Sequence, residues 1–226
     1  MTELSQQWLQ FNNAEAIAHA AVDRILLKAQ ESISHRGVFK LVLPGGTTPK
    51  RIYELLSDHQ QEWSKWHLFI GDERCLDNND VERNSVMIKQ SLLDKIKFPE
   101  ENFHPINAQL GPKKGASEYA ELISTFLPFD LILLGIGEDG HTASLFPGHQ
   151  HDESQLTHAV YNSPKAPPER VTLSKKTISQ SAEVIILVTG KNKHSAVQQW
   201  QQGELLPVAQ IQAARVSVLI DNDAQP

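Results

Sequence analysis

The chain has 226 residues, of which 40% are hydrophobic, and its 21 basic and 27 acidic side chains give a formal net charge of −6. This composition suffices for one continuous core and provides no general electrostatic attraction to nucleic acid or to an anionic membrane. No apolar run approaches the ~18 residues of a membrane span, no secretory signal is visible at the start, and the lone cysteine, Cys75, excludes an intrachain disulfide. We therefore expect one cytoplasmic domain over residues 1–226, with no membrane or nucleic-acid partner.

The first half of the chain predicts two successive units of strand, loop and helix. Apolar residues at steps of four predict a long helix over residues 14–33. After it, in chain order, we expect a strand at 38–43, the glycine loop 44–49, a helix that begins at Pro49, a strand at 67–71, a polar loop at 72–84 and a helix at 85–96.

The second half continues the same alternation. We expect a short strand near 103–106, a helix at 114–126, strands at 130–135, 158–162, 170–173 and 184–190, a helix from about Lys193 and a last strand at 216–220. Strands that alternate with helices predict an α/β protein with a three-layer Rossmann-like fold, a mainly parallel sheet with helices on both faces.

The carboxyl ends of the parallel strands are the expected place for a ligand site. Polar or glycine-rich loops follow four of the predicted strands, so we expect these loops to meet at one edge of the sheet. They are "PGGTTP" (44–49), "GDERC" (71–75), "GIGEDGHTAS" (135–144) and "TGKNK" (189–193).

The first of these loops is suited to hold a single phosphate. Gly45 and Gly46 permit backbone conformations that turn successive N–H groups toward one anion, and Thr47 and Thr48 add hydroxyl donors at a helix N-terminus. Lys193, after another strand, is positioned to supply a cation. An ordinary helix cap and a solvated surface lysine are the alternative interpretations.

The loop after the 130–135 strand has the G-x-G-x-x-G spacing of a dinucleotide-binding turn, at Gly135, Gly137 and Gly140. However, no helix follows directly, and no acidic residue ends the next strand at the required distance. We instead expect the glycines to make a sharp turn that presents Asp139 and His141. Histidine is the natural general base near neutrality, and a nearby carboxylate can orient its ring.

Other reactive side chains in these loops are interpreted as structural. Asp72 and Glu73 suit an internal ion-pair network beside Arg74, which is itself able to contact a ligand. Cys75 is expected to be a partly buried thiol. His149 and His151 form only a lone His-x-His pair, so no metal is expected.

Five segments carry a recognisable pattern in their order and spacing: "LPGGTTP", "GDERC" with the later Asn84, "FDLILLGIGEDGHTASLFPG", "SPKAPPERVTLS" and "VTGKNK". Together they resemble the 6-phosphogluconolactonases, and the likeness covers nearly the whole chain. Its most specific part is "GEDGHTASLFPG", which combines an Asp-Gly-His core shared with other sugar-phosphate enzymes and a lactonase-type ending.

This resemblance implies hydrolysis of 6-phospho-D-glucono-1,5-lactone to 6-phosphogluconate in the pentose phosphate pathway, without metal or cofactor. It implies phosphate-binding roles for Gly45, Gly46, Thr47 and Lys193, a general base at His141 and its partner at Asp139, and arginines that face the site at Arg74 and Arg170. We assign the oxyanion of the reaction to Arg170.

Three residues depart from the usual family pattern. Pro44 precedes the glycines where Ser or Ala is common, Thr47 replaces a Ser, and Arg83 stands at the usual Ser, which leaves open how residues 76–85 close over the site.

The sequence keeps two other functions open. A sugar-phosphate isomerase or deaminase would need a further acid that "SLFPG" does not supply, and a non-catalytic sugar-phosphate sensor would need a DNA-binding segment that the first 35 residues do not indicate. A monomer is expected, with the oligomeric state left open, as is whether the Pro-rich loop 163–170 acts as a lid.

Overall fold

A seven-stranded sheet, parallel throughout, forms the centre of the protein in the computed structural model, which describes residues 6–226. The strands of the middle are buried, as expected for a sheet covered on both faces. In spatial order they are β1 (Gln7–Phe11), β10 (Val216–Asp221), β9 (Val184–Val188), β6 (Leu131–Gly135), β2 (Phe39–Leu43), β3 (Trp66–Ile70) and β5 (Phe103–His104).

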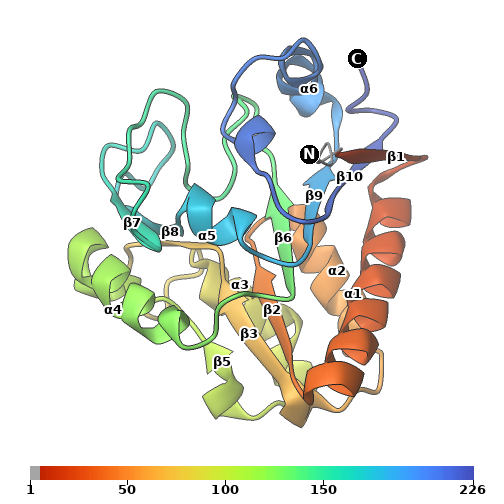
Figure 1. Cartoon of the computed structure of the whole chain (residues 1–226), viewed down its shortest axis with the longest axis vertical. Coiled ribbons are helices and arrows are strands. Elements are labelled where there is room, and N and C mark those ends of the chain that lie inside the picture. The colour runs from red at the N-terminus through yellow and green to blue at the C-terminus, as the bar shows by residue number, and fades with distance from the viewer. Residues whose placement is uncertain (1–5) are drawn as a thin grey trace.

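Helices cover this sheet, with α1 along one side and α4 on the other (Figure 1). The predicted α/β class and mainly parallel sheet are confirmed. The helices are α1 (Ala14–Arg36), α2 (Thr47–Ser57), α3 (Asn84–Ser91), α4 (Pro112–Ser124), α5 (Lys175–Ser179) and α6 (His194–Gln201). Helix α1 begins at the side-chain cap of Asn13 and ends at Gly37, whose φ of 77° suits glycine.

A second, antiparallel sheet lies beside the main one. It consists of β4 (Asp72–Arg74), β8 (Arg170–Leu173) and β7 (Thr157–Val160) in that order, and α4 packs against it. Arg74 is the register partner of Arg170, so two segments almost 100 residues apart bring their arginines together.

The structure corrects three predicted boundaries. The segment that follows β3 is partly a strand, β4, because it pairs with the distant β8. Helix α2 begins at Thr47, so Pro49 is its third residue, where its missing N–H still costs no intrahelical bond. Helix α3 ends at Ser91, whose hydroxyl donates to the carbonyl of Met87 at 2.6 Å and competes with the helical pattern.

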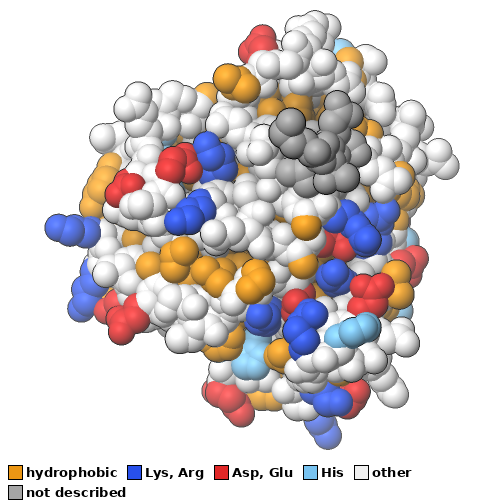
Figure 2. Space-filling view, viewed as in Figure 1, with side chains coloured by type: hydrophobic (Ala, Val, Ile, Leu, Met, Phe, Trp, Pro, Cys, Tyr) orange, Lys and Arg blue, Asp and Glu red, His pale blue; other side chains and the backbone are white. Residues whose placement is uncertain are grey.

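Besides β4, strand β1 and helix α5 have no counterpart in the sequence prediction. Strand β1 lies at the edge of the sheet and pairs with β10, and α5 is a short helix capped by the Ser174 side chain. Within residues 6–226, no helix is both long and apolar enough to cross a membrane. Figure 2 shows acidic and basic side chains interspersed over the visible face.

Candidate functional site

The four loops expected at the carboxyl edge do lie together. The hydroxyl oxygens of Thr48 and Thr189 are 2.7 Å apart, which joins the loop after β2 to the loop after β9. Ser144, in the loop after β6, donates to the Asp72 carboxylate after β3 at 2.6 Å. Because parallel strands end at the same edge, segments spread over 150 residues form one site.

The loop after β2 leaves the N-terminus of α2 open. Gly46 is the N-cap residue, with a φ of 114° and no side chain to cap the helix. A Cβ on Gly45 would lie 2.0 Å from Oδ1 of Asn84, so only glycine fits there. The first N–H groups of α2 are therefore free to bind an anion. Thr47 is exposed beside them, and Thr48 is half-buried.

Lys193 ends the 3₁₀ turn Lys191–Lys193, which follows β9. Burial lowers the pKa of its ammonium group, while the negative charges of Glu138 and Asp139 oppose that shift. The lysine therefore lies within electrostatic range of Glu138 and Asp139 in the His141 loop.

The loop after β6 makes the sharp turn that was predicted from its glycines. The Gly137 N–H donates to the His141 carbonyl at 2.8 Å, and Gly140 has a φ of 79°. The Nδ1 atom of His141 lies 2.5 Å from Oδ1 of Asp139. With Nδ1–H donating this hydrogen bond to the carboxylate, Nε2 is the nitrogen that remains to act as a base.

The environment of His141 favours the neutral ring. Burial lowers its pKa, and the hydrogen bond and charge of Asp139 only partly offset this effect. The Phe146 ring packs against the imidazole with the ring centroids 4.7 Å apart. Ala143, which lies between these two residues in the sequence, adopts a φ of 48°. This value is uncommon for a residue with a Cβ, and such backbone strain concentrates at functional sites.

Both predicted arginines are engaged with backbone carbonyls. Arg74 donates from Nη1 to Glu82. Arg170 is 5% exposed and donates from Nε to Pro167 and from Nη2 to Lys165 and Ala166, which leaves the Nη1 hydrogens outside these bonds. Burial lowers the pKa of Arg170, and the nearby Asp72 opposes this effect. Arg170 therefore fixes the Pro-rich loop beside the site.

A buried network lies beside the loop after β2, because Asn84, which borders Gly45, is bonded to Glu73. The sequence analysis interpreted Glu73 only as part of an ion-pair network. Glu73 is fully buried and accepts the N–H groups of Arg74, Asn84 and Ser85, each at 2.8 Å.

The cation of this network is the unusual Arg83, whose Nε lies 3.4 Å from the Glu73 carboxylate. Arg83 also donates to the Ile106 carbonyl and the Asn78 side chain, so residues 76–83 are tied down. The sequence marked Arg83 only as a departure from the usual Ser of the family. Its pairing with Glu73 is visible only in the folded structure.

The remaining reactive side chains have structural surroundings. Burial raises the pKa of Cys75 to about 11, which keeps the half-buried thiol protonated as expected. His151 stacks on His158 with centroids 4.4 Å apart. In residues 6–226, no three His, Cys, Asp or Glu side chains are grouped to hold a metal ion.

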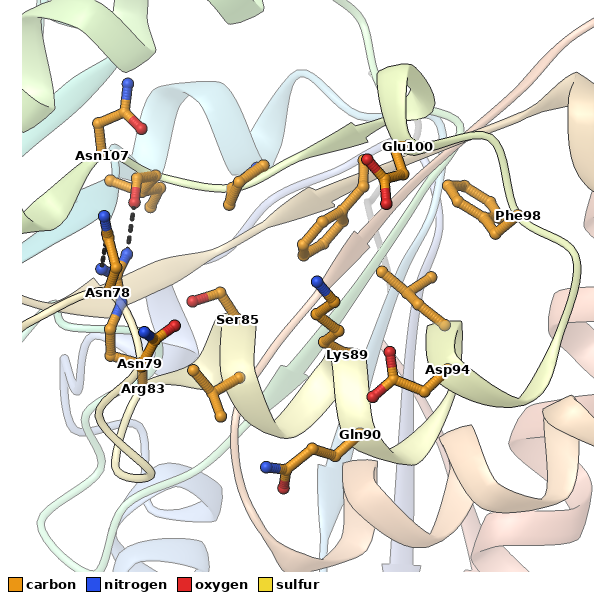
Figure 3. Close-up of a pocket in the computed structure, with 15 residues that line it drawn as sticks. Asn78, Asn79, Arg83, Ser85, Lys89, Gln90, Asp94, Phe98, Glu100 and Asn107 are labelled. Carbon is orange, nitrogen blue, oxygen red and sulfur yellow. Dashed lines mark hydrogen bonds between the residues drawn. The ribbon is translucent and has the colours of Figure 1, made fainter.

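A cavity of about 580 Å³ lies beside α3 (Figure 3). Lys89 extends into it between Ser85 and Glu100. The residues predicted for the site do not line this cavity, although Arg83 and Ser85 border both it and the Glu73 network.

The chain is similar to known proteins over most of its length. A family described as "Glucosamine-6-phosphate isomerases/6-phosphogluconolactonase" matches residues 12–220. A protein of Mycobacterium leprae named 6-phosphogluconolactonase is 34% identical over 220 residues, which cover 90% of this chain and 88% of the relative.

Solved structures show the same fold. The crystal structure of 6-phosphogluconolactonase from Thermotoga maritima superposes with a TM-score of 0.89 and 25% identity, covering 96% of this chain and 100% of the other. A monomeric glucosamine-6-phosphate deaminase superposes with a TM-score of 0.83 and 22% identity, covering 97% and 98%. The fold alone therefore does not distinguish the two kinds of enzyme.

Proposed function

The chain belongs to the glucosamine-6-phosphate isomerase/6-phosphogluconolactonase family, and from this premise we propose that it hydrolyses 6-phospho-D-glucono-1,5-lactone to 6-phosphogluconate. The observation that carries the proposal is the His141–Asp139 hydrogen bond of 2.5 Å, which lies at the same sheet edge as the open N-terminus of α2.

The phosphate of the substrate binds at the start of α2. The N–H groups near Gly46 and Thr47 donate to its oxygens, and Lys193 supplies the opposing charge. Anchoring the phosphate fixes the lactone carbonyl relative to His141. Because the carbonyl and the base are then already positioned, the attack of water has a smaller entropic cost.

His141 acts as the general base, through Nε2. It takes a proton from water as the oxygen of the water attacks the lactone carbonyl carbon. When the tetrahedral intermediate collapses, the bond between that carbon and the ring oxygen breaks, and the same proton passes from Nε2 to the ring oxygen. Asp139 holds the ring orientation and stabilises the imidazolium between the two steps.

Arg170 is the donor that we assign to the oxyanion. Its Nη1 hydrogens are not used in the bonds to the Pro-rich loop, and the guanidinium lies 5.8 Å from the Phe146 ring, which also packs on His141. A fixed cation at this place would stabilise the developing negative charge without reorganisation. No step requires a metal or a cofactor.

A deaminase or isomerase is the second candidate, because the family includes such enzymes. Proton transfer at carbon would need a further acid in the segment that follows the histidine. The segment 142–148 has no carboxylate, and Glu138 faces Asn192 and Lys165 at the rim. Two curated relatives, from Synechocystis and Mycobacterium leprae, are each 34% identical to this chain and carry the name 6-phosphogluconolactonase, which favours the lactonase.

The direct test generates the lactone from glucose 6-phosphate with its dehydrogenase and follows its loss in EDTA, with the spontaneous rate subtracted. Acceleration by the wild type and its loss in His141→Ala are expected. A rate equal to the spontaneous one, with turnover of glucosamine 6-phosphate instead, would overturn the assigned reaction while leaving the phosphate site intact.

A further inference from the structure

Lys165 places a positive charge at the rim of the site and has no part in the mechanism above. It lies in the Pro-rich segment between β7 and β8, and its carbonyl accepts a hydrogen bond from Arg170 Nη2 at 3.1 Å. A second bond, from the Ser163 N–H to the Pro168 carbonyl at 2.9 Å, closes the segment on itself. The backbone is thus held by two hydrogen bonds, while the side chain that carries the ammonium group is 43% exposed.

Glu138 is the partner of this ammonium group. One of its carboxylate oxygens lies 3.8 Å from Lys165 Nζ, and the other accepts a hydrogen bond from the Asn192 side chain at 2.7 Å. Glu138 therefore connects the Pro-rich segment to the turn that carries Lys193. Its side chain is 55% exposed, and ion pairs so accessible to water are weak enough to exchange partners.

The charge of Lys165 also acts on the groups assigned to the reaction. Burial lowers the pKa of His141 and of Lys193, and in each case the positive charge of Lys165 lowers it further. Lys165 is thus within electrostatic range of both the general base and the phosphate-binding lysine, although residues 165 and 193 belong to different loops.

We propose that Lys165 is a second cation for the substrate phosphate, which Glu138 holds in the free protein and releases when the phosphate binds. This inference rests on the proposed function for the place of the phosphate. A phosphate dianion at the start of α2 carries more charge than the Glu138 carboxylate and offers three acceptor oxygens. Because the backbone of Lys165 is already fixed, the exchange costs only the rearrangement of one side chain.

A purely structural role for the ion pair makes a different prediction. If the pair only fastens the Pro-rich segment, Lys165→Ala and Glu138→Gln break the same contact and should weaken ligand binding alike. If Lys165 serves the phosphate, the two variants should act in opposite directions. Glu138→Gln frees the lysine and removes a negative charge that repels the ligand.

The experiment measures calorimetric affinities of the full chain for 6-phosphogluconate, inorganic phosphate and unphosphorylated gluconate. Lys165→Ala should lower the affinity for 6-phosphogluconate and for inorganic phosphate about ten-fold. Glu138→Gln should raise both affinities about two- to five-fold. Lys165→Arg should keep most of the affinity. Lys113→Ala, an exposed lysine on α4, makes the same change in net charge and should have no effect. For the lactone itself, Lys165→Ala should raise KM and leave kcat within about two-fold.

Equal weakening by Lys165→Ala and Glu138→Gln would overturn the proposal, as would unchanged affinity of Lys165→Ala for both phosphate probes. The binding assay does not depend on turnover. If the wild type fails to hydrolyse the lactone but the opposite effects on phosphate affinity are seen, the proposed reaction is wrong and the role of Lys165 stands.

Discussion

Adding one methyl group at Gly137 should separate catalysis from substrate binding. A Cβ there would lie 1.9 Å from Nδ1 of His141 and 2.6 Å from Oδ1 of Asp139. Both atoms belong to the hydrogen bond that orients the imidazole. The Gly137→Ala variant should therefore displace the imidazole of the proposed base without removing any functional group of His141 or Asp139.

The size of the effect follows from this overlap. Ordinary contacts of a Cβ begin at 3.4 Å, so the imidazole must move by roughly 1.5 Å to relieve the contact of 1.9 Å. A displacement of about 1 Å from the reactive geometry costs on the order of 100-fold in rate. We expect kcat to fall by at least that factor. The affinity for 6-phosphogluconate should change little, because the start of α2 is untouched.

The assay is the initial rate of lactone hydrolysis, with thermal unfolding to check that the variant folds. Gly135→Ala is the matched control, because a Cβ at that position would have no atom within 4 Å. A folded Gly137→Ala variant that keeps a rate within about three-fold of the wild type would refute the role of the His141–Asp139 pair.

Two further predictions concern pH. Because burial holds the pKa of His141 below its usual value, kcat/KM should rise with pH on an acid limb below about 6.5 and level off before neutrality. Asp139→Asn should lower the plateau of kcat/KM about 10- to 100-fold and shift the acid limb to lower pH, because the Asp139 carboxylate raises the pKa of His141. An acid limb that does not shift in this variant would contradict the assignment. Burial lowers the pKa of His158 to about 4, so the unfolded chain takes up this proton first and the protein loses stability as the pH falls from about 6.5 toward 4. Urea unfolding at pH 7 and pH 5 should show His158→Phe losing about 2 kcal/mol less than the wild type, whereas equal losses would show that His158 does not titrate in this way.

The candidate site was largely predictable because its parts follow strands. Each of the loops at Gly45, Asp72, Asp139 and Thr189 comes directly after a buried apolar run. Once the sheet is recognised as parallel, the carboxyl ends of its strands must meet at one edge. The glycine spacing around Gly137 similarly predicted a turn that presents His141, and the structure confirms that turn.

Pairing between distant segments could not be predicted in this way. The segment of β4 was expected to be a loop, because its three residues are polar. It forms a strand because β8, almost 100 residues later, pairs with it. Strand β1 carries a weak local pattern and exists through its contact with β10 at the other end of the chain. Arg83 likewise pairs with Glu73 only because residues 76–83 fold back toward that carboxylate, and the local sequence does not indicate this path.

The sequence by itself determined the α/β class, the order of most elements and the residues proposed to carry the chemistry, because these follow from local apolar periodicity and from glycines next to strands. Only the tertiary structure decided how those residues are held. The Arg170 guanidinium is committed in part to the carbonyls of residues 165–167, and Glu138 faces both Lys165 and Asn192. Such contacts depend on distances between loops that are far apart in the chain, and local sequence patterns carry no information on those distances.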